Sequence, residues 1–386
     1  MHLCLARSNY PHDRRLPMAD VYKRLAKKLD ALPNGFPATE NGVELRILRK
    51  IFAPEDAEFA LKLKPMPETA EQIARRLRRP AESTRATLDQ MAANGQIGSF
   101  KMNGKQHYAV MPFVVGIYEF QLSRIDKELA DLFEEYMPTL VRTVGGQKPA
   151  VARVIPVNAS IDTSLEILPY ENLRARIEES RSFLINECIC RKEKTLQGEP
   201  CKHSTETCMA FTKEEGAYDY FRYAGRVISK DEALRILDAT EREGLVHATF
   251  NVQQDQMFVC NCCSCCCGFF RALKEFHAPY LLTRSNFVAS IDPEDCSGCG
   301  VCASERCPME AIQPADEAYA VIADRCIGCG VCTLTCPTEA IQLIRRAAEE
   351  QTLPPKNVIH WAVERTSAKS GPLKRLALRW WLARNG

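Results

Sequence analysis

The sequence predicts a multidomain protein of the α+β class, and three observations support this prediction. The chain has 386 residues, which exceeds one average domain. Stretches with helical spacing are followed by short strand-like pairs joined by turn residues. Eighteen of the 19 cysteines lie between Cys188 and Cys336, so the two halves of the chain differ sharply in composition. We therefore expect helical units first and cysteine-rich units after them.

The overall composition is that of a folded protein without a membrane span. Hydrophobic residues make up 46% and charged residues 26%, which excludes wholesale disorder. The longest nearly uncharged apolar run, 109–118, is much shorter than the roughly 20 residues that a bilayer span needs. No secretory signal is recognised, because the first residues lack a long apolar run. Crowded cysteines in such a chain favour metal thiolates over disulfides, and we expect a reducing, cytoplasmic location.

The first 120 residues are predicted to be mainly helical. Residues 1–40 form an N-terminal unit with one packing helix, 18–32, which ends before a run of proline and glycine. Two short helices are expected at 43–52 and 57–63. Together with the following helices and hairpin, they form a second unit, 41–120.

The pattern between residues 69 and 110 is specific. Thr69 and Gln72 fit a capping box that starts one helix, and a second helix is expected at 82–93. The dipeptide Asn103-Gly104 between two strand-like runs predicts a hairpin, because both turn positions need positive φ. This order of helix, turn, helix and hairpin resembles the winged helix-turn-helix of many bacterial regulators.

The winged-helix-like unit is basic where such a domain would contact DNA. Between residues 70 and 110, seven basic residues face three acidic ones, a net charge of +4. Candidate base-reading side chains on the second helix are Ser83, Thr84, Arg85 and Gln90. Winged helices also serve as protein-docking modules, in which the arginines would form a solvated face. Docking is favoured over DNA binding, since the cysteine-rich remainder is not typical of a regulator.

Residues 121–180 are expected to form a helical connector, and residues 181–287 a cysteine-rich α+β middle domain. Ser229 and Glu232 predict a capped helix that stops at Gly244, followed by two strands. Ten cysteines are candidate metal ligands: Cys188, Cys190, Cys201, Cys208, Cys260, Cys262, Cys263, Cys265, Cys266 and Cys267.

Six of these cysteines crowd into residues 260–267, where adjacent side chains cannot all face one metal. Cys260, Cys263 and Cys266 have a C-x2-C-x2-C spacing, which would let one loop wrap a cluster with three thiolates. The earlier group, 188–208, would supply a fourth ligand or a site of its own, so we expect both groups to meet in space. A further iron–sulfur cluster is favoured, with structural zinc and thiol redox chemistry or disulfides as alternatives. His203 is not expected to be a ligand.

The strongest motif is an internal duplication in residues 288–344. Each half places three cysteines two residues apart and a fourth before a proline, and then continues Pro-x-Glu-Ala-Ile-Gln. The cysteines are Cys296, Cys299, Cys302 and Cys307, then Cys326, Cys329, Cys332 and Cys336. This pattern resembles the bacterial-type ferredoxin domain that carries two [4Fe–4S] clusters.

The resemblance implies a ligand set for each cluster, because in that family the fourth cysteine of each run serves the other cluster. Cluster 1 would be held by Cys296, Cys299, Cys302 and Cys336, and cluster 2 by Cys326, Cys329, Cys332 and Cys307. The first half departs from the family, with four residues instead of three before its fourth cysteine. A one-residue bulge can absorb this difference. The proline after each fourth cysteine is expected to lead into a helix.

Charge and missing motifs favour an electron carrier. Residues 288–344 carry a net charge of −7 and the tail, 345–386, a net charge of +6, so an acidic face would steer towards a basic redox partner. No dinucleotide-binding glycine fingerprint, P-loop or flavin motif is present, and no catalytic residue is assigned. We predict an iron–sulfur protein that relays electrons to or from a redox partner enzyme, more as a carrier or accessory subunit than as a self-sufficient enzyme.

Two other functions stay open. One is a redox-responsive, winged-helix DNA-binding regulator. The other is an oxidoreductase with an additional cluster in the middle domain. The basic stretch 373–382 could make peripheral membrane contact.

Overall fold

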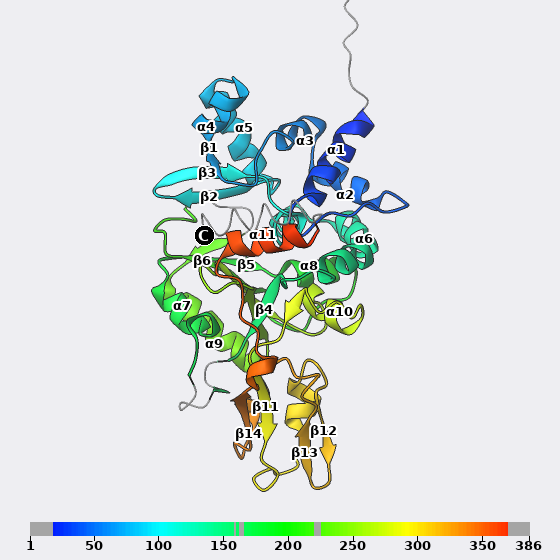
Figure 1. Ribbon diagram of the computed structural model, residues 1–386, viewed down its shortest axis with the longest axis vertical. Helices are drawn as coiled ribbons and strands as arrows, with labels where there is room; N and C mark the ends of the chain where they lie inside the picture. Colours follow the sequence, from blue (N-terminus) through cyan, green and yellow to red (C-terminus); the bar gives the residue numbers. More distant parts are fainter. Residues whose placement is uncertain (1–17, 158–159, 162–165, 220–224, 370–386) are drawn as a thin grey trace, which may run out of the picture.

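In the computed structural model, which describes residues 18–157, 160–161, 166–219 and 225–369, three helices open the chain at one end of the molecule (Figure 1). They are α1 (Met18–Asp30), α2 (Val43–Ile51) and α3 (Pro54–Ala60). Leu25, Leu29 and Ile47 are fully buried in the core that these helices share. The three helices expected from spacing are therefore confirmed.

The expected helix pair and hairpin follow. They comprise β1 (Glu68–Thr69), α4 (Ala70–Leu77), α5 (Ala81–Ala93), β2 (Gly98–Met102) and β3 (Lys105–Ala109). The three strands form an antiparallel sheet in the order β1-β3-β2. The capping box is confirmed, since the Thr69 hydroxyl accepts from the Gln72 N–H while the Gln72 side chain accepts from the Thr69 N–H. Asn103 and Gly104 have φ angles of 50° and 71°, as the hairpin requires.

One candidate base-reading residue was wrongly predicted. Thr84 is fully buried, and its hydroxyl donates to the Pro80 carbonyl oxygen at 2.8 Å, because it faces the start of its own helix. Ser83, Arg85 and Gln90 are exposed.

The hairpin also contacts the middle domain. Lys101 Nζ donates to the Glu215 carbonyl oxygen at 3.0 Å, and the Gly104 N–H donates to the Glu214 carboxylate at 3.0 Å.

The segment 121–180 differs from the expected helical connector. Helices α6 (Lys127–Gly145) and α7 (Leu173–Glu179) are present, but β4 (Ala152–Ile155) lies between them and is buried throughout. A short apolar run rich in β-branched residues is typical of a buried strand rather than a linker. The sheet formed by the strands between residues 182 and 283 therefore also includes a strand from before residue 181.

A seven-stranded sheet in the order β10-β4-β8-β9-β6-β5-β7 forms the middle of the molecule. The β10–β4 pair is parallel and the other pairs are antiparallel. The strands besides β4 are β5 (Ser182–Glu187), β6 (Glu206–Thr212), β7 (Arg226–Ile228), β8 (Val246–Phe250), β9 (Phe258–Cys262) and β10 (Leu282–Thr283).

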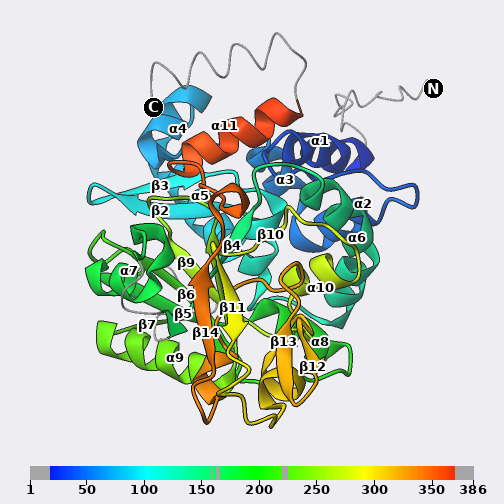
Figure 2. The ribbon, with the colours of Figure 1, turned by 60° about the horizontal axis from the view of Figure 1, so that its bottom comes forward.

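Helices cover both faces of this sheet (Figure 2). Helix α7 and α9 (Lys230–Glu243) pack on one face, where Leu237 meets Phe183 and Met209. Helix α10 (Gly268–Lys274) packs Phe270 on the other face, and α8 (Ile189–Leu196) lies on the same side. The predicted start and stop of α9 are confirmed by the Ser229 cap and by Gly244, whose φ is 82°.

Two small antiparallel pairs form the end of the molecule opposite the N-terminal helices (Figure 1). They are β11 (Phe287–Ile291) with β14 (Ile341–Arg345), and β12 (Ile312–Ala315) with β13 (Ala318–Val321). The helices expected after the two Cys-Pro pairs are wrong. Glu310 and Glu339 adopt left-handed φ angles of 52° and 57°, which end each turn and send the chain into a strand.

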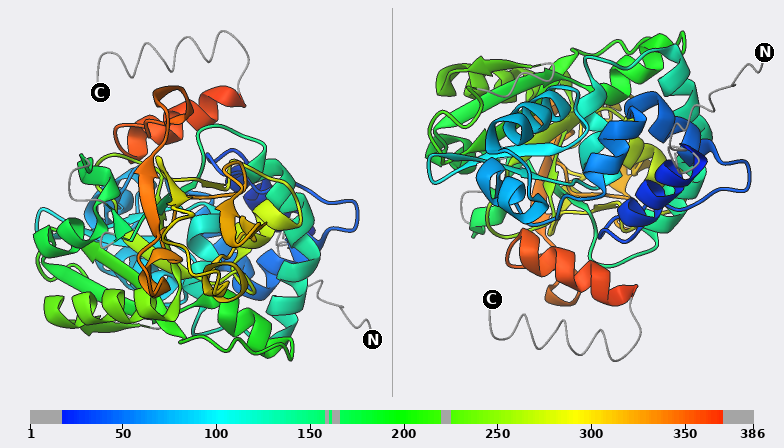
Figure 3. Two further views of the ribbon diagram at one scale, coloured as in Figure 1. Left: turned by 90° about the horizontal axis from the view of Figure 1, so that it is seen from below. Right: turned by 90° about the horizontal axis from the view of Figure 1, so that it is seen from above.

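The chain then returns to the N-terminal part as α11 (Val358–Ala368), seen along the side of the molecule in Figure 3. The fully buried Arg365 donates to the carbonyl oxygens of Val144, Gln147 and Pro149 at the end of α6. The basic region after 345 is thus partly a packed helix, while the stretch 373–382 lies outside the described residues. Among the helices described, none has the length and apolar character needed to cross a bilayer.

Candidate iron–sulfur and thiolate sites

Four cysteines from both halves of the duplication line one hollow near the surface. This outer hollow is lined by Cys296, Cys299, Cys302 and Cys336, together with Tyr319 and Ile341. Cys299 is exposed, and the other three thiols are partly exposed. Cys336 comes from the second half of the duplication and therefore crosses to the first.

The other four cysteines line a second, inner hollow. It is lined by Cys307, Cys326, Cys329 and Cys332. Cys329 and Cys332 are buried. Burial raises the pKa of the Cys329 thiol to about 12, so the thiolate form there requires a neighbouring cation.

Glycines let the cysteine loops pass close to neighbouring backbone. Gly328 has a φ of 65°, and a Cβ atom added to it would lie 2.1 Å from the Phe287 carbonyl oxygen. A larger residue would therefore push the loop away from β11 and open the inner hollow.

Backbone N–H groups support the two crossing thiols. The Cys307 sulfur accepts from the Ala311 N–H at 3.2 Å. The Cys336 sulfur accepts from the backbone of Thr338, Ala340 and Ile341. Hydrogen bonds of this kind stabilise a thiolate that ligates iron.

The additional residue in the first half is accommodated by a wider turn. Residues Cys302–Arg306 form a π-type turn in which the Cys307 N–H donates to the Cys302 carbonyl oxygen at 3.0 Å. The corresponding turn, Thr333–Thr335, is a tighter 3-10 helix. The cysteine that follows each turn still lines a hollow, so the expected bulge is present.

The ten middle-domain cysteines come together in space, but as two sets. Six form a closed ring in which each sulfur interacts with two others, in the order Cys188, Cys190, Cys267, Cys262, Cys260 and Cys208. Cys188, Cys262 and Cys267 are buried. We call this set the thiol ring.

The contacts within the thiol ring shift the pKa values of neighbouring thiols in opposite directions. Neighbouring thiols lower the pKa of Cys188, Cys260 and Cys267, and they raise the pKa of the three sulfurs between them. The protonation of each sulfur in the ring therefore depends on its neighbours. Negative charge in a buried place of this kind is costly unless a cation neutralises it.

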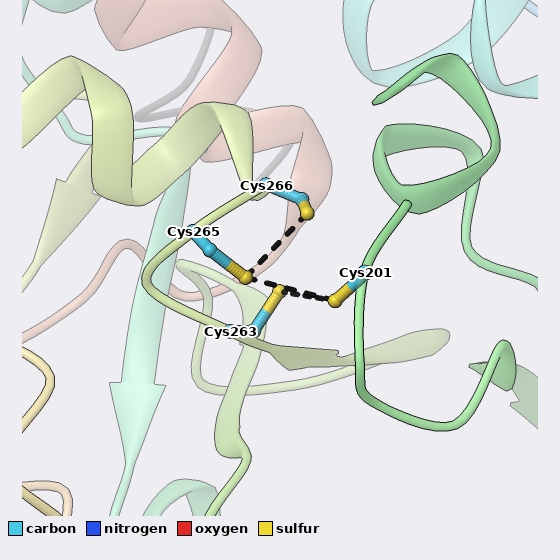
Figure 4. A group of neighbouring side chains, drawn as sticks. All are labelled: Cys201, Cys263, Cys265 and Cys266. Carbon is cyan, nitrogen blue, oxygen red and sulfur yellow. Dashed lines mark hydrogen bonds between the residues drawn. The ribbon is translucent and has the colours of Figure 1, made fainter. Parts of the chain in front are cut away.

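The other four cysteines, Cys201, Cys263, Cys265 and Cys266, form the thiol tetrad (Figure 4). Their sulfur atoms all lie within 4.8 Å of one another. Three come from the loop between β9 and α10, and Cys201 reaches them from the loop after α8.

The three cysteines with the C-x2-C-x2-C spacing are divided between the two sets. Cys260 belongs to the thiol ring, whereas Cys263 and Cys266 belong to the tetrad. The physical reason is that Cys260 lies within β9, where successive side chains point to opposite faces, while the tetrad cysteines lie on the loop beyond it. His203 joins neither set and pairs instead with Glu243 at 2.9 Å.

A charged residue that the sequence did not single out lies between the two sets. Arg191 is fully buried, and its guanidinium interacts with the Cys263 sulfur and with the negative charge of Cys188 and Cys201. Its Nη atoms donate to the carbonyl oxygens of Ser204 and Asn261. Its position after Cys190 was the only available signal.

Apolar packing connects the cysteine sites in series. The outer and inner hollows share a core that contains Cys302 and Cys332. A second core joins the inner hollow to the thiol ring through Cys329, Phe270 and Cys267.

Comparison with known families adds one match. Residues 287–345 match the 4Fe-4S dicluster domain family, so this part of the chain is similar to that family. No curated protein and no solved structure matches the chain.

Proposed function

We propose that the chain is an iron–sulfur electron-transfer protein that uses two [4Fe–4S] clusters to pass electrons to or from a redox partner. The observation that carries this proposal is the sorting of eight cysteines into two four-sulfur hollows within the segment similar to dicluster domains. The side chains that line the two hollows fit such clusters, because each hollow offers four thiols. Neither lining contains a carboxylate, amide or imidazole side chain that would compete for iron. When bound, such clusters take up and release single electrons.

The proposed ligand sets are crossed. Cys296, Cys299, Cys302 and Cys336 would hold the outer cluster, and Cys326, Cys329, Cys332 and Cys307 the inner one. The lining of each hollow supports this assignment. The proximity of Cys336 to three thiols from the first half is what a crossed arrangement requires.

Exposure supports a direction of access. Cys299 is exposed, so a partner would approach the outer hollow. The inner hollow lies between that surface and the middle domain, and its core excludes water around Cys329. The net charge of −7 in residues 288–344 favours a partner with a basic docking face.

A further iron–sulfur centre in the thiol ring would extend this path. The shared core of Cys329, Phe270 and Cys267 favours it, because the ring then adjoins the inner hollow without intervening solvent. This is the arrangement that an oxidoreductase with an additional cluster would need.

The described cysteines are all free thiols, which suits a reducing compartment such as the cytoplasm.

We propose that the winged-helix-like unit, residues 41–120, is a protein-docking module and does not bind DNA. The Lys101 ammonium and the Gly104 N–H of the hairpin already donate to the middle domain, so neither group is available for a phosphate. Gel-shift assays on genomic DNA fragments, in both oxidised and reduced protein, are expected to show no sequence-specific shift. A specific, redox-dependent shift would favour the regulator instead.

Anaerobic stopped-flow mixing tests the electron-transfer proposal. Protein reduced with dithionite and freed of excess reductant should transfer electrons to a one-electron viologen or quinone acceptor. Cys299→Ser should reduce the number of electrons delivered per chain, while Glu294→Gln, an exposed residue of the same loop outside the lining of the hollow, should leave it unchanged. Failure of the reduced wild-type protein to reduce any acceptor would contradict the proposal.

A further inference from the structure

The thiol tetrad differs in kind from the two hollows of the dicluster segment. Among the described residues, it is the only group of three or more candidate ligands whose donor atoms all lie within 4.8 Å of one another. The Cys201 sulfur lies 3.8 Å from that of Cys263 and 3.6 Å from that of Cys265. Cys265 and Cys266 are 3.5 Å apart.

These separations match a single metal ion. Four thiolates at the usual Zn–S distance of about 2.3 Å, placed at the corners of a tetrahedron, are about 3.8 Å apart. In a [4Fe–4S] cluster each thiolate binds a different iron at a different corner of the cube, so its four cysteine sulfurs lie farther apart. The compact tetrad therefore suits one ion rather than a cubane.

The surroundings of the tetrad supply the second contacts that a thiolate site needs. The Cys201 sulfur accepts from the His203 N–H, and the Cys263 sulfur accepts from the Cys266 N–H. The buried Arg191 guanidinium interacts with Cys263, and its Nε has no oxygen partner. N–H groups and one positive charge directed at the sulfurs would offset the double negative charge of a tetrathiolate.

Both access and rigidity fit a structural ion. Cys265 is exposed, so an ion can reach the site from solvent. The other sulfurs pack with Leu245 in a small separate core. An ion here would join the loop that carries Cys201 to the loop that carries Cys263, and both loops adjoin segments that bear thiol-ring cysteines.

We propose that Cys201, Cys263, Cys265 and Cys266 bind one Zn²⁺ ion in a tetrahedral tetrathiolate site that fixes the two cysteine-bearing segments against each other. Binding converts four thiols to thiolates and releases four protons to solvent, with no change in oxidation state. Zn²⁺ suits this role because it has no redox chemistry and imposes no geometry beyond the tetrahedron that the sulfurs already offer.

Metal analysis of the full chain tests the proposal. Anaerobically purified wild-type protein should contain one zinc per chain in addition to its iron, with X-ray absorption at the zinc edge showing sulfur ligands at about 2.3 Å. Cys265→Ser should lose the zinc and retain the iron. Cys299→Ser, a matched change at another exposed cysteine, should lose iron and retain the zinc.

Cobalt replacement gives a second readout, the absorption spectrum of the wild-type protein, which does not require a variant to fold. Protein grown with cobalt should show the strong visible and near-ultraviolet bands of a tetrahedral thiolate site, and Cys201→Ser should weaken them. Zinc retained in Cys265→Ser and Cys201→Ser, a single iron in place of zinc, or oxygen and nitrogen ligands at the zinc edge would each overturn the proposal. None of these outcomes bears on the dicluster segment, whose iron is measured separately.

Discussion

Arg306, the residue just before Cys307, donates from its guanidinium to the carbonyl oxygen of Glu241 at 3.2 Å. It also donates to the carbonyl oxygens of Arg242 and Val331. The bonds to Glu241 and Arg242 join the wide turn of the dicluster segment to the C-terminal end of α9, where the helix carries partial negative charge. The turn with the additional residue, before Cys307, therefore also carries the arginine that holds this segment against the middle domain.

Replacing Arg306 should loosen that contact. Arg306→Ala removes three charge-assisted hydrogen bonds, so we expect a loss of about 1–3 kcal/mol in the free energy of unfolding and faster proteolysis between the two domains. Denaturant unfolding and limited trypsin digestion measure both effects. Arg325→Ala is the control, because the described partners of Arg325, Met309 and Glu310, lie within its own segment. Equal effects of the two changes would contradict the docking role.

The crossed ligand sets predict which variants resemble each other. Cys336→Ser and Cys299→Ser should alter the same electron paramagnetic resonance signal of the reduced protein, although the two residues lie far apart in the sequence. Cys307→Ser should alter the other signal. The assignment would be refuted by a Cys336→Ser spectrum that matches that of Cys326→Ser.

The division of the middle-domain cysteines predicts different metal losses from two cysteines three residues apart. Cys263→Ser should lower the zinc content, because Cys263 belongs to the thiol tetrad. Cys260→Ser should leave zinc in place and lower any iron in excess of that in the dicluster segment. Mass spectrometry of metals in the two purified variants measures this difference, and loss of the same metal from both would show that the two sets form one site.

The raised pKa of the Glu193 carboxyl predicts that the stability of the fold depends on pH. Burial raises the pKa of its carboxyl to about 7, and the Tyr118 hydroxyl donates to it at 2.6 Å. The folded state then binds a proton that the unfolded state releases, so this stabilisation is present below the ordinary pKa and is lost as the pH rises through about 7.

Glu193→Gln should remove this dependence while keeping an acceptor for Tyr118. Between pH 5 and 8 the wild type should lose up to about 3 kcal/mol more unfolding free energy than the variant. Denaturant titrations at several pH values measure the difference, and Glu187→Gln, at a half-exposed position at the end of β5, is the control. Parallel pH profiles for wild type and Glu193→Gln would contradict the buried titration.

Local chemistry made much of the fold predictable. The cap at Thr69, the stop at Gly244 and the turn at Asn103-Gly104 each depend on a few adjacent residues, and each was located correctly. Long-range pairing was not predictable in the same way. Strand β4 joins a sheet whose other strands lie up to 130 residues away in sequence, so its apolar run gave no sign of its partners.

The candidate sites show the same difference between local features, which were predictable, and long-range contacts, which were not. The duplicated motif located eight cysteines because each set of three is local and its fourth member follows within five residues, directly before a proline. The partition of the middle-domain cysteines depends on the direction of side chains along β9 and on the approach of Cys201 from another loop. Spacing alone grouped Cys260 with Cys263, which the strand separates.

Anaerobic iron and sulfide quantification, combined with electron paramagnetic resonance of the reduced full-length protein, tests the central claim most directly. The account predicts about eight or more irons and a matching amount of sulfide per chain, with two interacting signals typical of reduced [4Fe–4S] clusters. Cys299→Ser and Cys329→Ser should each remove one of the two. Protein that carries only zinc, or iron without sulfide, would contradict the claim that this chain transfers electrons through two clusters.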